Sequence, residues 1–417
     1  MQSINLMAPA GSWESLQAAI KSGADSVYLG INQFNMRANT SKSFNINDLD
    51  KIVALCKEKK VECYLVLNTL VYDAEINNLK EICKLAKKAD MDAVIVSDWA
   101  AVNIARDHDL KVHISTQANI SNLETVKFYA KYCDVIILAR ELSLKQIAHI
   151  CSEITKQHIC DPEGQLIKIE VFVHGALCVS IAGKCYMSLA LFNQSANRGA
   201  CIQPCRRSYT VTDDQTGDQL KIDNKYVMSP ADLCTIGMID KLILAGVSVF
   251  KIEGRGRSSE YVYKVTKAYR EAIDSVIDGT YSEERIKNWI KSLKSVYNRN
   301  FWQNGYYLGH KLGKWADSYG SQSSLKKLYA GKVTNYFKKS KIVELVIEDN
   351  TIKLGDKIIV TGLTTGYSDT LVKSIFKDDK PVKIADKGST VTIPYPETIR
   401  RNDKVYVLRK RTEPFNP

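Results

Sequence analysis

One pattern of hydrophobic and polar positions recurs through most of the chain. Short runs rich in β-branched residues are each followed by a segment in which apolar residues recur every three or four positions. The first pattern is typical of a buried strand and the second of an amphipathic helix. Eight such strands are expected, at residues 4–8, 26–30, 62–68, 93–97, 111–115, 135–139, 168–173 and 247–253.

Alternating strands and helices predict a parallel sheet covered by helices, and eight such units predict a TIM-type (β/α)8 barrel. Helices are expected between the strands, for example at residues 12–22, 46–60, 75–90 and 123–132. In such barrels the chemistry lies at the carboxyl ends of the strands. Any single polar residue after a strand is more often a helix cap or turn residue. Together, the polar residues that follow the strands are expected on one rim: Asn32, Arg37, Asn68, Asp98, Gln117, Asn119, Arg140, Glu141, His174, Glu253 and Arg255.

Two parts of the chain depart from the repeating pattern. The connection after the seventh strand, residues 174–226, is far longer than an ordinary βα loop, which predicts an insertion over the barrel mouth. Later, short alternating strands replace the β/α pattern. We therefore expect a barrel domain at residues 1–297, a linker at 298–326 and a small C-terminal all-β barrel at 327–417.

Composition narrows the class of protein. The first residues, MQSINLMAPAG, lack the basic and apolar regions of a signal peptide, and no long uncharged apolar stretch follows. We expect a cytoplasmic protein with no membrane partner. The formal net charge of +12, from 58 Lys and Arg against 46 Asp and Glu, attracts polyanions. Nucleic acid becomes a candidate partner, although a lysine-rich composition alone gives the same charge.

The eleven cysteines fall into two groups. Six are scattered through apolar or mixed segments and are predicted to be buried thiols, whereas five crowd into one loop-like region that ends near residue 234. The numbers of residues between the five are 6, 15, 3 and 28 in chain order. The crowded five are Cys178, Cys185, Cys201, Cys205 and Cys234.

These spacings favour an iron–sulfur cluster. Structural zinc sites usually show paired cysteines two to four residues apart, and only Cys201 and Cys205 meet that rule. Four thiolates drawn from irregular loops are typical of a cluster. Zinc and free or catalytic thiols stay open as alternatives, and spacing does not decide which cysteine is spare. Such a cluster would lie over the barrel mouth beside His174, Arg140 and Glu253, where it could contact substrate or simply hold the long loop together.

Several sequence segments resemble the collagenase-like peptidase family, the U-thirty-two peptidases. The segments are EVFVHGALCVSIAGKC, NRGACIQPCR and MSPADLC, with MAPAGSWESLQAAIKSGADSVYLG, FNMRA and LARELSL elsewhere in the chain. The resemblance implies a barrel with a 4Fe–4S cluster, held by Cys178, Cys185, Cys201 and Cys234, with Cys205 as an alternative ligand. It also implies RNA or quinone hydroxylation, because relatives form 5-hydroxyuridine at the tRNA wobble position or hydroxylate ribosomal RNA, using prephenate and no molecular oxygen.

The C-terminal segment favours the RNA-hydroxylating relatives over the quinone-hydroxylating ones. LYAGKVTNYFKKSKIVELVIEDNTIKLGDKIIVTG resembles the second-domain barrel of translation elongation factors, which often meets tRNA or the ribosome. Basic and aromatic residues are interleaved there, as RNA-binding surfaces require, although an ordinary solvated β-barrel would also accommodate them. The expected partner is tRNA, and a second family member is a further candidate.

The leading hypothesis is a tRNA hydroxylase that forms 5-hydroxyuridine. His174, Glu253 and Arg140 are the candidate catalytic residues, the first two for proton transfer. Guanidinium groups suit a dicarboxylate such as prephenate. A peptidase, a ribosomal RNA hydroxylase and a non-catalytic RNA-binding factor stay open, although the chain lacks HExxH and GxSxG motifs. The candidate substrate-binding residues are Arg37, Asn68, Gln117 and Arg255.

Overall fold

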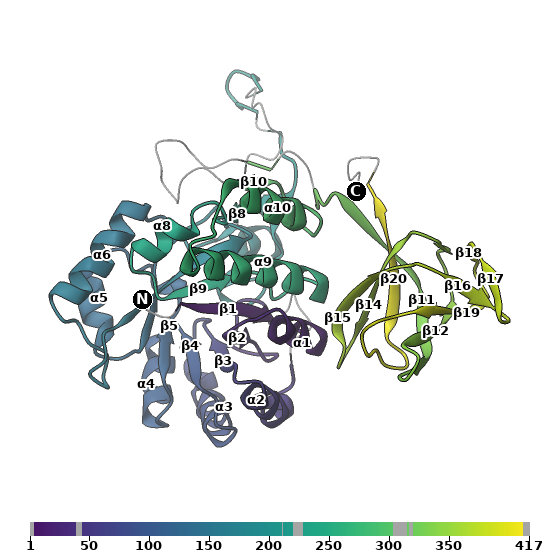
Figure 1. Cartoon of the computed structure of the whole chain (residues 1–417). Helices are drawn as coiled ribbons and strands as arrows, with labels where there is room; N and C mark the ends of the chain where they lie inside the picture. Colours follow the sequence, from purple (N-terminus) through teal and green to yellow (C-terminus); the bar gives the residue numbers. More distant parts are fainter. Residues whose placement is uncertain are drawn as a thin grey trace.

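The structure is a computed structural model that describes residues 4–38, 44–210, 212–219, 228–302, 315–316 and 320–411. Eight parallel strands form a closed barrel, because β9 pairs with both β7 and β1. The predicted TIM-type barrel is therefore confirmed (Figure 1). Its strands are β1 (Asn5–Ala10), β2 (Ser26–Leu29), β3 (Glu62–Leu67), β4 (Ala93–Val96), β5 (Val112–Ile114), β6 (Val135–Ile137), β7 (Lys168–Gly175) and β9 (Val249–Ile252).

Helices surround the barrel, and several begin at residues that the sequence marks as caps. At the start of α1, for example, the Ser12 hydroxyl accepts a hydrogen bond from the Ser15 amide at 3.3 Å, which satisfies an amide that the helix leaves free. The helices are α1 (Trp13–Lys21), α2 (Leu49–Glu58), α3 (Ile76–Lys88), α4 (Trp99–Asp107), α5 (Leu123–Ala130), α6 (Leu144–Lys156), α8 (Ile239–Leu244), α9 (Ser259–Ile277) and α10 (Glu283–Lys294).

The connection after β7 contains short elements of its own. Helix α7 (Met187–Phe192) lies in it, followed by the single turns η4 (Ala196–Arg198) and η5 (Pro204–Arg206). Two further strands extend the barrel sheet: β8 (Asp232–Cys234) runs antiparallel to β7, and β10 (Phe301–Trp302) runs parallel to β8. Strand β10 falls within the segment expected to be a linker. Residues 220–227 of the insertion, and 303–314 and 317–319 of that linker, lie outside the described residues.

An antiparallel all-β module follows, as predicted. Its core is separate from that of the barrel and is built from alternating residues such as Val343, Leu345 and Ile347. The strands are β11 (Leu325–Phe337), β12 (Ile342–Ile347), β13 (Ile352–Lys353), β14 (Lys357–Gly362), β15 (Gly366–Leu371), β16 (Ile375–Lys377), β17 (Lys380–Val382), β18 (Ile384–Ala385), β19 (Thr390–Pro394) and β20 (Lys404–Lys410).

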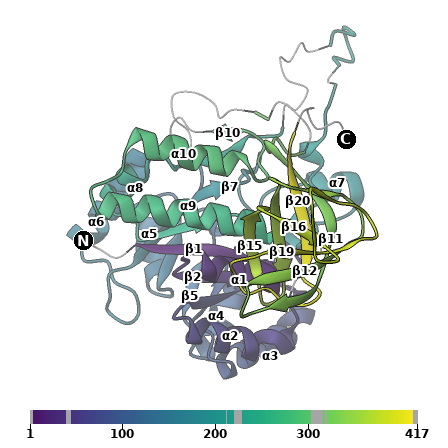
Figure 2. The same ribbon diagram turned by 45° about the vertical axis from the view of Figure 1, so that its right-hand side comes forward.

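The module packs directly on the barrel beside α1, as the two views show (Figures 1 and 2). The rings of Tyr263 on α9 and Tyr367 on β15 lie 4.7 Å apart, and Lys21 of α1 donates a hydrogen bond to the Tyr367 carbonyl at 3.1 Å. Tyr367, Ile359 and Leu408 of the module are buried in the same hydrophobic cluster as the barrel core. These three residues thus attach the module to the barrel through apolar contacts, while the module's own core stays separate.

Within the described ranges, no helix is both long and apolar enough to cross a membrane.

The tight contact between module and barrel gives a test at Gly366. This residue has φ +67°, and a Cβ there would lie 2.7 Å from the Gln17 Cβ and 2.8 Å from the Ala18 nitrogen of α1. Gly355 also has a positive φ, +84°, but a Cβ there would meet nothing within 4 Å. We expect Gly366→Ala to lower the free energy of unfolding by about 1–3 kcal/mol more than Gly355→Ala, because only the first adds a clash to the backbone strain. Urea unfolding measures both; equal losses would show that the contact is not tight.

Candidate functional site

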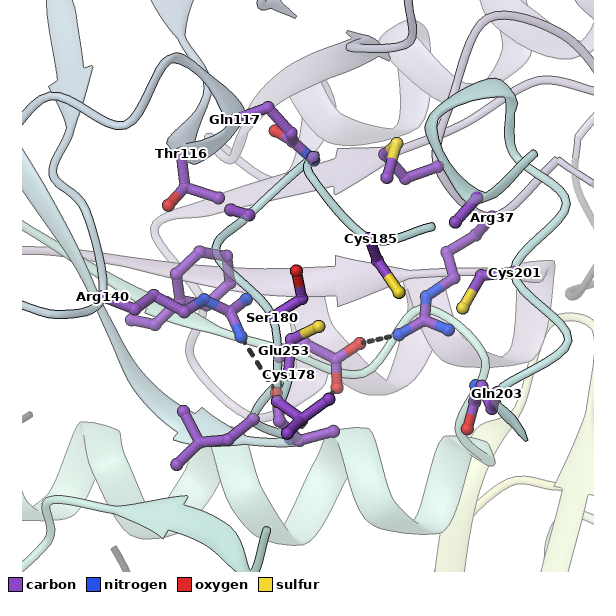
Figure 3. A pocket seen from close by; sticks show the side chains of 18 of the residues that line it. Arg37, Thr116, Gln117, Arg140, Cys178, Ser180, Cys185, Cys201, Gln203 and Glu253 are labelled. Atoms are coloured by element: carbon purple, nitrogen blue, oxygen red, sulfur yellow. Dashed lines mark hydrogen bonds and ion pairs between the residues drawn. The ribbon is translucent and has the colours of Figure 1, made fainter. Parts of the chain in front are cut away.

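A cavity of about 590 Å³ lies at the carboxyl ends of the barrel strands. This volume is in the range of small-molecule sites. Its base is formed by side chains of the strands, including Val66, Ile95 and Ile137, and its other walls come from the insertion after β7. The insertion thus covers the barrel mouth, where this fold places its chemistry (Figure 3).

Lys251 of β9 lies at the base of the cavity. Its amine is 2.7 Å from a carboxylate oxygen of Glu170, and both side chains are buried. The amine also lies 4.6 Å from the centre of the Tyr28 ring and 5.5 Å from that of Phe172, which are cation–π distances. Burial lowers the pKa of Lys251, and Glu170 acts in the opposite direction. The second carboxylate oxygen of Glu170 is buried without a hydrogen-bond partner among the described residues.

Arg37 and Glu253 form an ion pair across the cavity, with 3.2 Å between Nη2 and Oε1 (Figure 3). The other Glu253 oxygen accepts a hydrogen bond from the Ala176 amide at 3.3 Å. Burial opposes ionisation of Glu253, but Arg37, Arg257 and Arg140 outweigh it and hold the pKa of this carboxyl below its usual value. Glu253 is therefore an ionised counter-charge for the arginines of the cavity.

Two further arginines are held in place by packing and hydrogen bonds. Arg140 donates to the Ala176 carbonyl at 3.1 Å, and its guanidinium carbon lies 3.9 Å from the centre of the Phe172 ring. Its Nε is buried and has no hydrogen-bond partner among the described residues. Arg255 donates to the Asn35 side-chain oxygen at 3.0 Å, and burial lowers its pKa to about 10. Both guanidinium groups are thus fixed before any ligand binds.

Positive charge dominates the cavity lining. Only two carboxylates, Glu141 and Glu253, are among its described residues. Such an excess in a confined site favours an anionic ligand. The seven cationic residues that line it are Arg37, Arg140, Arg206, Lys251, Arg255, Arg257 and Arg299.

Amide and hydroxyl groups line another part of the wall. The Asn68 amide nitrogen donates to the Ser115 hydroxyl at 3.2 Å and to the Gln117 oxygen at 3.1 Å, while its oxygen accepts from the Met36 amide at 3.3 Å. These groups come from the ends of β3 and β5 and line the same cavity. The structure therefore brings together the four residues expected to bind substrate: Arg37, Asn68, Gln117 and Arg255.

Four cysteines of the insertion line the cavity, namely Cys178, Cys185, Cys201 and Cys205. Three of them are seen close to the Arg37–Glu253 pair in Figure 3. Burial raises the pKa of Cys205, and the nearby thiols of the other three add to this, whereas Arg206 opposes it. No group of three or more Cys, His, Asp or Glu side chains in the described ranges surrounds a single point closely enough to bind one metal ion.

Cys234 lies apart from these four thiols. It is buried on β8, with its sulfur 3.9 Å from the Tyr269 hydroxyl of α9, and it does not line the cavity. The set expected first from the family resemblance, with Cys234 as fourth ligand, is therefore not the set that shares this cavity. Sequence spacing could not show which of the two cysteines joins the cavity. Cys205 lies in the insertion, whereas Cys234 lies on β8, where the chain has returned to the barrel sheet.

His174 also lies away from the cavity, although Glu253 and Arg140 line it as expected. A bulge between Phe172 and His174 shifts the register of β7 against β9. Phe172 faces the cavity, whereas the His174 ring is buried against α9, with Nδ1 3.2 Å from the Tyr269 hydroxyl. Burial lowers the pKa of His174 to about 3. The imidazole is neutral at ordinary pH and does not reach a ligand in the cavity, so the placement gives no support to a catalytic role.

Several site residues were missed from the sequence alone, among them Arg206, Arg257 and Arg299 of the cavity lining. Lys251 and Asn35 received no role, yet the first forms the cavity base and the second holds Arg255. For Lys251 a signal existed: it is the one charge in the otherwise apolar strand β9, and Glu170 lies between the apolar residues Ile169 and Val171 of β7. Charged residues inside buried strands are rare unless they are paired.

The fold and the site together define a (β/α)8-barrel protein with a cationic, cysteine-lined cavity at the carboxyl ends of its strands. The model of the family described as "Peptidase family U32" matches residues 11–317, and the chain belongs to this family. The family membership expected from the sequence is thus confirmed.

Relatives in this family carry two kinds of name. A "Collagenase" of Porphyromonas gingivalis is 48% identical, covering 98% of each chain. "tRNA hydroxylation protein P1" of Bacillus subtilis is 28% identical over 90% of this chain and 87% of its own length. A 23S rRNA 5-hydroxycytidine synthase of Escherichia coli is 35% identical over 66% of this chain and 40% of its own length. All are named as enzymes, either peptidases or RNA hydroxylases.

The buried Glu170–Lys251 pair gives a stability test. Glu170→Ala leaves the Lys251 ammonium buried without its counter-charge, so we expect a loss of about 3–5 kcal/mol in the free energy of unfolding. The double variant Glu170→Met, Lys251→Met removes both charges and should regain most of that loss. Urea unfolding of the full chain measures each; a single variant as stable as the parent protein would show that the pair is not buried.

Proposed function

We propose that this chain is a cytoplasmic tRNA hydroxylase that converts the wobble uridine to 5-hydroxyuridine, with prephenate as hydroxyl donor and a 4Fe–4S cluster as cofactor. The observation that carries the proposal is the cavity itself. It combines seven cationic side chains with four cysteines at the mouth of the barrel. The names of the relatives that act on tRNA and ribosomal RNA support the same reaction class.

The four cavity cysteines suit a cluster better than a single metal ion. Each thiolate of a 4Fe–4S cluster binds a different iron atom, so the ligands need not converge on one point. This agrees with four thiols that share one cavity without surrounding a common centre. In this proposal Cys178, Cys185, Cys201 and Cys205 hold the cluster. When bound, it would supply redox chemistry or orient the substrate.

The arginines of the cavity suit prephenate, which carries two carboxylates. Arg140 and Arg255 are prepositioned by Phe172 and Asn35, so little side-chain entropy is lost on binding. Glu253 stays ionised beside Arg37, which keeps the positive charge of the mouth partly balanced until the anion enters.

A peptidase is the second candidate, because a relative of 48% identity is named collagenase. A cysteine peptidase needs an imidazole within hydrogen-bond reach of its thiol. No described histidine lines the cavity, and His174 is buried against Tyr269. His310 lies outside the described residues. Two further alternatives are ribosomal RNA hydroxylation and RNA binding without chemistry. The tests below distinguish both from the proposed reaction.

The main test is nucleoside mass spectrometry of tRNA from a strain that lacks this chain. We expect 5-hydroxyuridine and its derivatives to disappear, to return with the intact gene, and to stay absent with Cys178→Ala. Ribosomal RNA from the same strain and a gelatin digestion assay with the anaerobically purified protein test the rivals. Unchanged tRNA together with gelatin cleavage would overturn the hydroxylase and favour the peptidase.

The choice between Cys205 and Cys234 as fourth ligand is tested by iron and sulfide analysis. We expect Cys205→Ser to lose the cluster absorbance of the anaerobically purified protein, because its thiol shares the cavity with the other three. Cys234→Ser is the matched control and should keep its iron, since that thiol faces Tyr269. The reverse result would restore the ligand set implied by the family resemblance.

The role of Arg140 is tested by steady-state kinetics with prephenate. Removing a charged hydrogen-bond donor costs about 1.5–3 kcal/mol, so Arg140→Ala should raise the KM for prephenate roughly tenfold or more. Arg106→Ala is the control, because Arg106 lies on the exposed face of α4, where it donates a hydrogen bond to the Tyr132 carbonyl, and it does not line the cavity. An unchanged KM for the Arg140 variant would remove it from the donor site.

A further inference from the structure

Exposed apolar side chains surround the entrance of the cavity. Tyr186 and Ile181 of the insertion are 73% and 54% exposed, and Tyr72, on the loop after β3, is 58% exposed. Clustered exposed apolar groups mark an interaction surface more often than single ones do. We call Tyr72, Ile181, Tyr186, Phe192, Arg198 and Arg207 the rim surface.

The rim surface is continuous with the cavity. Leu70 donates its amide to the Asn197 carbonyl at 3.3 Å, which joins the loop after β3 to the insertion. Arg198 pairs with Glu75 in the same loop, with 2.7 Å between Nη1 and Oε2. Asn197 and Ile181 themselves line the cavity. A ligand that enters the cavity therefore passes over these side chains.

The charge of this segment favours a polyanion. From His174 to Thr210 the chain has four Lys or Arg residues and no Asp or Glu. A segment with charge of one sign attracts a polyanion such as RNA. Here Glu75, which holds Arg198, is the acidic group in direct contact with the rim surface.

Two arginines lie over aromatic rings of the rim surface. The Arg198 guanidinium carbon is 4.1 Å from the centre of the Tyr72 ring, and that of Arg207 is 5.0 Å from the centre of the Phe192 ring. Unpaired RNA bases stack on aromatic rings and on guanidinium planes. Each pair thus places an exposed aromatic residue next to a positive charge.

We propose that the rim surface binds the unpaired nucleotides that flank the target base of an RNA loop, by stacking them on Tyr72, Tyr186 and Phe192. This rests on the proposed function, because it assumes that the cavity receives one base. A cavity of about 590 Å³ holds a nucleotide and a small donor but not a loop. The neighbouring nucleotides of an extruded base must then lie outside it, on the rim.

The test compares the affinities of the full-length protein for two RNA probes by fluorescence anisotropy. One is a stem-loop with a seven-nucleotide loop of anticodon type, and the other a blunt duplex of equal length. We expect Tyr72→Leu and Phe192→Leu each to weaken loop binding about tenfold, because leucine keeps the apolar area but has no ring face. Duplex binding should stay unchanged, since it depends on charge.

Two control variants separate stacking from other effects. Tyr72→Phe keeps the ring and should bind the loop as the parent protein does. Leu244→Ala removes an 89% exposed side chain at the end of α8. Helices of this barrel run back toward the amino ends of the strands, so Leu244 lies far from the mouth, and its variant should bind both probes normally.

The outcomes keep this proposal distinct from the proposed function. Loss of loop affinity in the leucine variants supports the rim surface even if tRNA nucleosides prove unchanged in the deletion strain. Unchanged loop affinity overturns the rim proposal. It does so even if the same variants abolish binding of a protein partner. If the variants keep their loop affinity while 5-hydroxyuridine still depends on the chain, the rim proposal fails and the hydroxylase stands.

Discussion

The pairing of β9 with both β1 and β7 is the constraint on which the rest of the structure depends. It joins residues near position 5 to residues near position 249 and closes the sheet into a barrel. Closure turns eight separate strand ends into one ring, so side chains from β2, β3, β4, β6, β7 and β9 face a common space. Without it, Arg37, Arg140 and Arg255 would lie along an open edge rather than around one cavity.

Concentrating so many cations in one place requires counter-charges within the barrel. Glu170 pairs with Lys251 at the base, Glu253 with Arg37 at the wall, and Asp232 lies 3.5 Å from Arg299. Each carboxylate is buried or partly buried, which makes each interaction stronger than it would be in water. The net field nevertheless stays positive at the mouth, because the lining arginines outnumber the carboxylates. The barrel thus stabilises its cations while leaving donors for an anionic ligand.

The cysteine-bearing insertion forms one wall of the cavity with its inner side and the exposed rim surface with its outer side. Its thiols line the inner side, next to Arg37 and Glu253, whereas Tyr186 and Phe192 are exposed on the outer side. The segment from His174 to Thr210 has no carboxylate, so both sides favour negative charge. The C-terminal module packs against α1 and α9 through β14 and β15 and contributes no residue to the cavity lining (Figure 2).

The sequence by itself determined the eight barrel strands, the approximate extent of four helices, the all-β module and several polar residues of the cavity, because each follows from local periodicity or from residues next to strand ends. Arg37, Asn68, Gln117, Arg140, Glu253 and Arg255 share the cavity for that reason. Only the tertiary structure decided the rest. A bulge in β7 turned His174 toward Tyr269, and the return of the chain through β8 placed Cys234 away from the other thiols while Cys205 joined them. A bulge and a long-range return path depend on contacts between distant segments, which no local pattern of residues specifies.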